Sequence, residues 1–369
     1  MIYLDYAATT PMSEAALYTY QEIARRGYGN SNSLHDIGNY AADIVRMSQN
    51  QLAEKLHVNP QHIHFTNGGT HANQLGVELL LQHKQKQGRH IIASGMEHKS
   101  INDFLENLRL NKGYDITYLP ATQAGIVDTN QLQHILRSDT VLVIVQHINS
   151  EIGAIQPIEE IAGLLKEQQI LFHCDGIQAF GKLAIDLAQL PIDSYSISSH
   201  KIYGPKGIGA VYLNPQSVQL NKLDIGTLDV PSIAAFATAA SSIVEKQNEE
   251  WLQMQKLRDS FVQQLKTLKF PLQLLTYPNQ LPSIIGILFD EIPGDYAMLA
   301  FNQAGIAIST GSACTVGNQM ANTTLLNLGY TEEVAKRFVR ISLGKTTTMK
   351  QLEKVIQVCE NMITKWYST

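Results

Sequence analysis

The chain has 369 residues, 44% of them hydrophobic, and carries a formal net charge of −5 at pH 7. This length suits an enzyme of two domains, and a net negative charge without any basic run argues against binding to nucleic acid. The longest apolar stretches, such as Thr140 to Val145, are too short to cross a membrane, and the first residues lack a signal segment, so we expect a cytoplasmic protein.

The chain opens with a short extended piece and two predicted helices. Pro11 ends the extended piece, and Ser13 is expected to cap a helix that Gly27 terminates. A polar loop over residues 29–36 leads to a second helical run from Asn39 to Leu56.

A glycine turn follows in the segment from His64 to Thr70, HFTNGGT. Its pattern predicts a strand, a tight turn and the start of a helix. Free backbone N–H groups at such a helix start, together with the Thr70 hydroxyl, form a site suited to a phosphate group. A glycine turn alone is weak evidence. We favour the phosphate site because Ser198 and His200 offer further donors beside Lys201.

The region from His90 to Val211 alternates between apolar strands and amphipathic helices. Strands are predicted at His90 to Ser94, Ile116 to Pro120, Val141 to Val145, Ile170 to Cys174 and Ser194 to Ser198. Helices are predicted at Asn130 to Leu136 and Ile158 to Leu165. This alternation indicates a parallel sheet covered by helices on both faces, with ligands at the carboxyl ends of its strands.

Polar side chains follow several of these strands. His98, Asn149 and Asp175 each come after the end of a different strand. A histidine can stack on a planar ring and move protons, and an aspartate can pair with a pyridinium nitrogen. Taken singly, each also fits a loop histidine, a turn asparagine or a helix-capping aspartate. Their shared position at strand ends favours a cofactor site.

Lys201 lies in the sequence SSHKIYGPKG, where a strand gives way to a turn rich in glycine and proline. A lysine amine forms an imine with an aldehyde, which is how enzymes hold pyridoxal phosphate (PLP). A surface lysine beside a polar turn is the simpler alternative. With Ser198 and His200 as donors to an anion, we expect Lys201 to bind this cofactor.

The composition changes after Pro215, where a second unit is predicted. An alanine-rich helix covers Ala234 to Val244, and the amphipathic spacing of residues 251–265 predicts a long helix that bridges two domains. A strand, a helix and a strand follow at Ser283 to Phe289, Tyr296 to Asn302 and Ile306 to Thr310. Arg340 begins a further strand-like segment, and its guanidinium could hold a substrate carboxylate or form a surface ion pair.

The cysteines differ in their sequence surroundings. Cys174 lies in an apolar strand, and Cys359 lies on an apolar helical face behind a capping box of Thr348 and Gln351, so both are expected to be buried. Cys314 stands among small, polar and glycine residues, which predicts an exposed thiol able to handle sulfur. Their spacing suggests neither a disulfide nor a metal site.

Motifs spread over nearly the whole chain resemble those of the PLP-dependent cysteine desulfurases of the NifS/IscS type, within the class V aminotransferase family. They are YLDYAATTP, GNSNSLH, FTNGGT, MEHKS, INSEIG, HCDGIQ, SSHKIYGPKG, TGSACT and RISLGK. The resemblance implies the PLP-dependent transferase fold of type I, an α/β fold. A large PLP-binding domain (14–250) would hold a mainly parallel sheet covered by helices. A smaller α/β domain (1–13 and 251–369) would carry the catalytic cysteine loop.

The resemblance also assigns roles to the candidate residues. Lys201 would form the Schiff base with PLP, Asp175 would pair with the pyridine nitrogen and His98 would stack on the ring. The remaining cofactor-binding residues would be Gln178 and Asn149 near the ring oxygen, Gly69, Thr70, Ser198 and His200 at the phosphate, and Thr227 from the partner subunit of a homodimer. Arg340, with Asn149, would bind the carboxylate of L-cysteine.

The reaction implied by the resemblance converts L-cysteine to L-alanine and leaves its sulfur as a persulfide on Cys314. Lys201, His98 and Cys314 would be the catalytic residues, and an acceptor protein, such as a scaffold for iron-sulfur cluster assembly or a tRNA thiolation enzyme, would take the sulfur. Selenocysteine lyase or another class V PLP enzyme stays open as an alternative. The short segment before Thr227 also leaves open a non-catalytic homologue.

Overall fold

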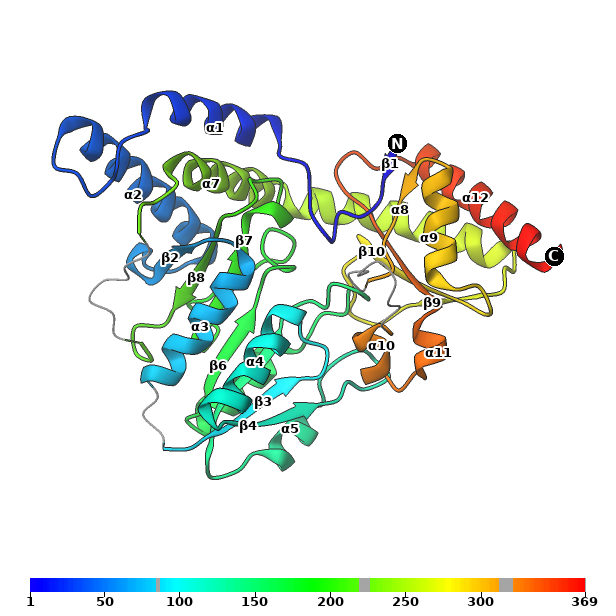
Figure 1. Cartoon of the computed structure of the whole chain (residues 1–369), viewed down its shortest axis with the longest axis horizontal. Coiled ribbons are helices and arrows are strands. Elements are labelled where there is room, and N and C mark those ends of the chain that lie inside the picture. The colour runs from blue at the N-terminus through cyan, green and yellow to red at the C-terminus, as the bar shows by residue number, and fades with distance from the viewer. Residues whose placement is uncertain (84–86, 219–225, 312–320, 369) are drawn as a thin grey trace.

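The computed structural model describes residues 1–83, 87–218, 226–311 and 321–368. These residues form two lobes that lie side by side (Figure 1). The larger lobe contains a seven-stranded sheet, and the smaller lobe contains a three-stranded sheet. Within the described ranges, no helix has both the length and the apolar character that crossing a membrane would require.

The seven-stranded sheet is mainly parallel, as predicted. Its strands lie in the order β2 (Ile63–Thr66), β8 (Gly209–Leu213), β7 (Ser194–Ser198), β6 (Leu171–Asp175), β5 (Thr140–Gln146), β3 (His90–Ser94) and β4 (Asp115–Leu119). Strand β8 is antiparallel to both neighbours because it returns from β7 through the turn at residues 204–207. All strands predicted between His90 and Ser198 are present, with bounds that differ from the prediction by at most one residue.

Helices cover both faces of this sheet. Alternate residues of β5 belong to two separate apolar clusters, Val143 and Val145 to one and Leu142 and Ile144 to the other. One face packs against α3 (Gly69–His83) and α4 (Lys99–Lys112), and the other packs against α2 (Asp36–Leu56), α5 (Thr129–Ile135), α6 (Ile158–Glu167) and α7 (Val230–Glu245). This two-sided burial explains why β3 and β5 are nearly continuous apolar runs in the sequence.

Capping side chains set the starts of the first helices. Ser13 Oγ accepts a hydrogen bond from the Ala16 N–H at the start of α1 (Glu14–Arg26), as predicted. Helix α2 begins at Asp36, earlier than the predicted Asn39. The reason is that the His35 imidazole acts as the cap, accepting a hydrogen bond from a backbone N–H in the first turn of the helix.

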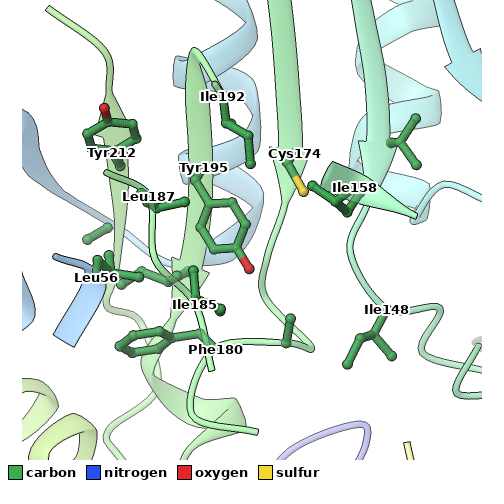
Figure 2. Packing of buried hydrophobic residues seen from close by; sticks show 14 of the residues in the cluster. Leu56, Ile148, Ile158, Cys174, Phe180, Ile185, Leu187, Ile192, Tyr195 and Tyr212 are labelled. Carbon is green, nitrogen blue, oxygen red and sulfur yellow. The ribbon is translucent and has the colours of Figure 1, made fainter. Parts of the chain in front are cut away.

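The core of the larger lobe contains Cys174 and Tyr195 (Figure 2). Both side chains are completely buried. Burial raises the pKa of the Cys174 thiol well above its ordinary value, so the thiol stays protonated. The Tyr195 hydroxyl lies 2.9 Å from Nδ1 of His147, which satisfies both groups inside the core. Cys174 is therefore a packing residue.

The smaller lobe is built on a second, antiparallel sheet. Strand β10 (Ile284–Phe289) lies between β9 (Leu272–Leu275) and β12 (Phe338–Ser342), and helices α9 (Gly294–Gln303) and α12 (Met349–Ser368) pack with it. The predicted strand from Ile306 to Thr310 is shorter: β11 (Ile306–Ala307) pairs with β1 (Ile2–Tyr3), and Ser309 then forms an isolated bridge to Arg340. The remaining short elements are η1 (Pro60–His62), η2 (Ser199–Lys201), α10 (Thr323–Asn327) and α11 (Glu332–Ala335).

Helix α8 (Gln247–Thr267) connects the two lobes. Trp251, near its start, packs against the core of the larger lobe, whereas Met254 and Phe261 belong to the core of the smaller lobe. Leu4 joins the core of the smaller lobe from the other end of the chain, and so does the buried Cys359. We propose, on this packing, that residues 14–250 form one domain and residues 1–13 with 251–369 the other.

Candidate active site

Predicted site residues gather at one edge of the seven-stranded sheet. Asp175 and Ser198 are the last residues of the parallel neighbours β6 and β7. His98 caps α4 a few residues after β3, and Gly69 begins α3. Because parallel strands end at the same edge of a sheet, side chains from distant parts of the chain meet there.

Lys201 ends the short helix η2 and contacts the N-terminal segment of the chain. Its Nζ donates hydrogen bonds to the carbonyl oxygens of Ala7 (2.5 Å) and Ala8 (2.8 Å). Burial lowers the pKa of Lys201 to about 8, and the nearby positive charge of Arg340 acts in the same direction. At pH 7 about a tenth of the amine is then neutral and nucleophilic, far more than for a lysine with the ordinary pKa of about 10.4.

Asp175 is held by two hydrogen bonds. Its Oδ1 accepts from the Ile177 N–H (2.9 Å), and its Oδ2 accepts from Nδ2 of Asn73 (2.8 Å). Asn73 is completely buried in α3, and its Oδ1 lies 3.3 Å from Nε2 of His173. Sequence reasoning missed Asn73, although its position one turn after the glycine turn could have placed it beside the strand ends.

His98 presents an exposed ring that is fixed by the start of α4. Its Nδ1 accepts a hydrogen bond from the Ser100 N–H (3.1 Å), which assigns the proton of the neutral imidazole to Nε2. Desolvation by the surrounding protein lowers the pKa of His98, and the negative charge of Asp175 opposes this change. The lower pKa favours a neutral ring that can donate the Nε2 proton.

A corner with features suited to an anion lies where α3 begins beside β7. A Cβ atom on Gly69 would lie 2.5 Å from Cδ1 of Ile177 and 3.3 Å from Cβ of Ser198, so a larger residue there would displace the Ile177 side chain. Ser198 Oγ is buried, and none of the described residues forms a hydrogen bond with it. Thr70 is exposed in the first turn of α3. The Ser198 hydroxyl and the free N–H groups at the start of α3 can donate hydrogen bonds to the oxygen atoms of a phosphate.

His200 borders this corner from η2. Its Nδ1 lies 3.1 Å from Oγ1 of Thr9. Burial lowers the pKa of His200 to about 4, and the charge of Lys201 adds to the effect. The imidazole is therefore neutral at neutral pH and acts through hydrogen bonds.

The two predicted amide side chains are both buried and hydrogen-bonded. Gln178 donates from Nε2 to the Ala7 carbonyl (2.7 Å) and accepts at Oε1 from Nζ of Lys182 (2.5 Å). Asn149 donates from Nδ2 to Oγ1 of Thr324 (3.1 Å) and accepts at Oδ1 from two backbone N–H groups. Lys182 was not predicted, and it fixes which end of the Gln178 amide is the acceptor.

Arg340 reaches the same region from the smaller lobe. It lies in the middle of β12 and not at the start of a strand as predicted, and it is only 4% exposed. Its Nη2 donates to Oδ1 of Asp5 (2.7 Å), and its Nη1 donates to the Ser150 carbonyl (2.9 Å). It is therefore a buried, paired arginine, and the alternative of a surface ion pair is wrong.

Of the remaining predicted residues, one lies on a loop and the other is outside the described residues. Thr227 is exposed on the loop that leads into α7. Cys314 falls in residues 312–320, outside the described residues. The site as described consequently combines the edge of the seven-stranded sheet, the N-terminal segment and β12.

The donor set fits pyridoxal phosphate. The Ser198 hydroxyl, which has no hydrogen-bond partner among the described residues, and the start of α3 suit the phosphate. The hydrogen-bonded Asp175 carboxylate suits a pyridinium nitrogen, and the Lys201 amine suits the aldehyde. The described residues contain no group of histidine, cysteine and carboxylate side chains suited to a metal ion.

Comparison with known proteins agrees with this chemistry. The family model Aminotransferase class-V matches residues 2–222 and 216–355. A Bacillus subtilis (strain 168) protein named "Putative cysteine desulfurase NifS" is 40% identical, over 96% of this chain and 93% of the relative. A Buchnera aphidicola protein named "Cysteine desulfurase IscS" is 35% identical, over 99% of this chain and 93% of the relative.

Solved structures give the same result. A protein titled "NIFS-LIKE PROTEIN" superposes with a TM-score of 0.87 at 28% identity and covers 96% of this chain and 99% of its own. The structure of DndA from Streptomyces lividans has a TM-score of 0.75 at 28% identity, with coverage of 92% and 99%. The chain belongs to the class V aminotransferase family and, within it, to the PLP-dependent cysteine desulfurases of the NifS/IscS type.

Proposed function

We propose that this protein is a cysteine desulfurase that converts L-cysteine to L-alanine and transfers the sulfur to Cys314. One observation carries the proposal: residues 5–8 contact both Arg340 and Lys201. A carboxylate-binding guanidinium from one lobe and an imine-forming amine from the other therefore meet at a single short segment. An α-amino acid needs both groups close together.

The residues of the large lobe would hold the cofactor. Bound PLP supplies an electron sink for negative charge at the substrate α-carbon. Ser198, His200 and the start of α3, with Gly69 and Thr70, would bind its phosphate. Asp175, oriented by Asn73, would keep the pyridine nitrogen protonated. Gln178 would present its Nε2 donor to the ring oxygen because Lys182 occupies its Oε1.

Proton transfer and sulfur transfer follow from the remaining groups. Lys201, with a pKa of about 8, can both accept and return a proton at the substrate α-carbon. His98 can supply a second proton from Nε2. Overall, the C–S bond of cysteine breaks and an S–S bond to Cys314 forms. The thiol proton ends on the carbon that becomes the methyl group of alanine, so no external oxidant is required.

Incubating the purified holoenzyme with L-cysteine tests this proposal. We expect L-alanine and, in the first turnover, an equimolar persulfide on Cys314, detected by mass spectrometry of the peptide. Alanine without a modified thiol would contradict the assignment of Cys314 and favour the lyase alternative. A purified protein that takes up no PLP would support the non-catalytic alternative.

We also propose that the protein is a homodimer. Exposed apolar side chains gather on α1, α2 and the loop between them: Tyr18, Tyr28, Leu34, Ile37, Tyr40 and Met47. Helix α2 packs against α7, and the loop before α7 carries the exposed Thr227. Pairing through this face would bury the apolar patch and offer Thr227 to the phosphate corner of the partner subunit.

Sedimentation equilibrium tests the dimer. The wild-type chain is expected to sediment as a dimer at micromolar concentration, and Tyr40→Glu combined with Met47→Glu is expected to weaken the dimer at least about a hundredfold. Leu110→Glu, at an exposed apolar position on α4, is the matched control and is expected to leave dimerisation unchanged. A monomeric wild-type protein would refute the proposal.

The destination of the sulfur is a separate proposal. An acceptor protein would take the persulfide sulfur from Cys314, and both iron-sulfur cluster assembly and tRNA thiolation are consistent with the chemistry. The expected cytoplasmic location stays a prediction, and a cell-fractionation experiment would test it.

A further inference from the structure

The guanidinium of Arg340 lies between two carboxylates. Asp5 makes a direct hydrogen bond to Nη2 at 2.7 Å. Glu151 is on the other side, with Oε2 3.7 Å from Nη1, too far for a direct hydrogen bond. Arg340 Nε is buried and makes no hydrogen bond to any described residue. When both carboxylates are ionised, their negative charge therefore exceeds the single positive charge of Arg340.

The negative charge of Glu151 is less well compensated than that of Asp5. Its side chain is 15% exposed, against 22% for Asp5. Among the described residues its Oε2 accepts one hydrogen bond, from Nδ2 of Asn322 (3.3 Å), and a Cβ on Gly311 would lie within 2 Å of that oxygen. Burial raises the pKa of Glu151, while Arg340, Asn322 and the more distant Lys201 lower it and Asp5 raises it.

A substrate carboxylate at Arg340 would add a third negative charge to this cluster. If Asp5 and Glu151 were both ionised, the three carboxylates around Arg340 would carry two negative charges more than Arg340 can neutralise. A buried site of low polarity strongly disfavours such an excess of charge. Asp5 keeps its direct ion pair, whereas Glu151 loses attraction to an arginine that is now shared with the ligand. Protonation of Glu151 reduces the excess negative charge at a lower cost in free energy than protonation of Asp5.

We propose that Glu151 takes up a proton when a carboxylate ligand binds Arg340, so that Glu151 is a positioning residue whose protonation is coupled to substrate binding. The inference rests on the proposed function, because it takes Arg340 as the carboxylate-binding group. Linkage makes the coupling reciprocal: where Glu151 is ionised in the free enzyme, the affinity for the carboxylate falls as the pH rises, by up to about tenfold per pH unit.

The probe for the test is 3-sulfanylpropanoate, which has the carboxylate and thiol of cysteine but no amine to react with the cofactor. Its binding to the holoenzyme is measured by isothermal titration calorimetry between about pH 5.5 and about pH 8, in pairs of buffers with different ionisation enthalpies. The buffer dependence of the binding enthalpy gives the number of protons exchanged. We expect the wild type to take up as much as about one proton.

Glu151→Gln is the matched variant, because the amide keeps the size of the side chain and removes its charge. We expect it to bind the probe without proton uptake, with an affinity independent of pH, and at least about tenfold more tightly than the wild type at the upper end of this pH range. Lys201, Arg340 and the cofactor are unchanged in this variant. Proton uptake that persists in Glu151→Gln therefore belongs to those groups and overturns the inference.

Two further measurements separate this inference from the proposed function. Absence of proton uptake by the wild type overturns the coupling even if the variant does not fold, and it leaves alanine formation from L-cysteine unaffected. Arg340→Gln is expected to weaken probe binding at least about a hundredfold. Binding that survives this substitution would instead refute Arg340 as the carboxylate site, on which the proposed function depends.

Discussion

Lys201→Ala is expected to abolish covalent PLP binding and to lower the rate of alanine formation at least about a thousandfold. The structure gives two physical reasons. The Lys201 amine, with a pKa lowered to about 8, is poised to be nucleophilic near neutral pH. It is also held by the Ala7 and Ala8 carbonyl oxygens at the point where the two lobes meet. The visible absorption of the protein and an alanine assay report the two effects.

Lys206→Ala is the matched control for this prediction. Lys206 is an exposed lysine of the same turn, five positions after Lys201. Its loss is expected to change alanine formation by less than about twofold, because surface substitutions of this kind rarely disturb structure. If Lys201→Ala retained a cofactor that borohydride reduction fixes to the protein, another lysine would be the Schiff-base residue. Peptide mapping would then identify it.

Cys314→Ala is expected to abolish persulfide formation and to lower the rate of alanine formation from L-cysteine at least about a thousandfold, with PLP binding intact. The other two cysteines cannot replace it. Both Cys174 and Cys359 are buried. Burial raises the pKa of the Cys359 thiol to about 12 and that of Cys174 well above its ordinary value. Neither thiol forms the nucleophilic thiolate near neutral pH.

Alkylation provides an independent check on Cys314. The native protein is expected to react with iodoacetamide at one cysteine, Cys314, and the Cys314→Ala variant is expected to react at none. Cys359→Ala is the control: it should keep the catalytic rate while losing some stability, about 1 kcal/mol or more, because it leaves a small cavity in the core. Rapid labelling of Cys174 or Cys359 in the folded protein would contradict the burial of these thiols.

The sequence was sufficient to predict the sheet and the residues at its edge. Strands β3 and β5 are mostly apolar because helices bury both of their faces, and β6 and β7 are followed by segments that contain glycine, so the strand ends are recognisable in the sequence. Asp175 is the last residue of β6, Lys201 follows the end of β7 by three positions, and His98 follows the end of β3 by four. The local signals for a strand end and for a glycine turn were therefore enough to locate His98, Asp175 and Lys201.

The sequence was not sufficient to predict the partners of these residues. Asp5 meets Arg340 and Asn73 meets Asp175, at separations of 335 and 102 positions along the chain. Periodicity and turn signals describe only neighbouring residues, so they carry no information on such contacts. Glu151 and Lys182 were overlooked for the same reason, since their significance depends on which charges the fold brings beside them.

The N-terminal segment has a consequence for how the enzyme matures. The backbone of Leu4 and Ala7 is hydrogen-bonded to Ser342, and Asp5 to Arg340, so these contacts form only after residues that lie at least 335 positions further along the chain have been synthesised. The sheet of the larger lobe can assemble during synthesis, whereas the substrate pocket cannot close until β12 has emerged. Nascent chains stalled before β12 would accordingly be folded in their larger lobe and still be unable to hold cysteine.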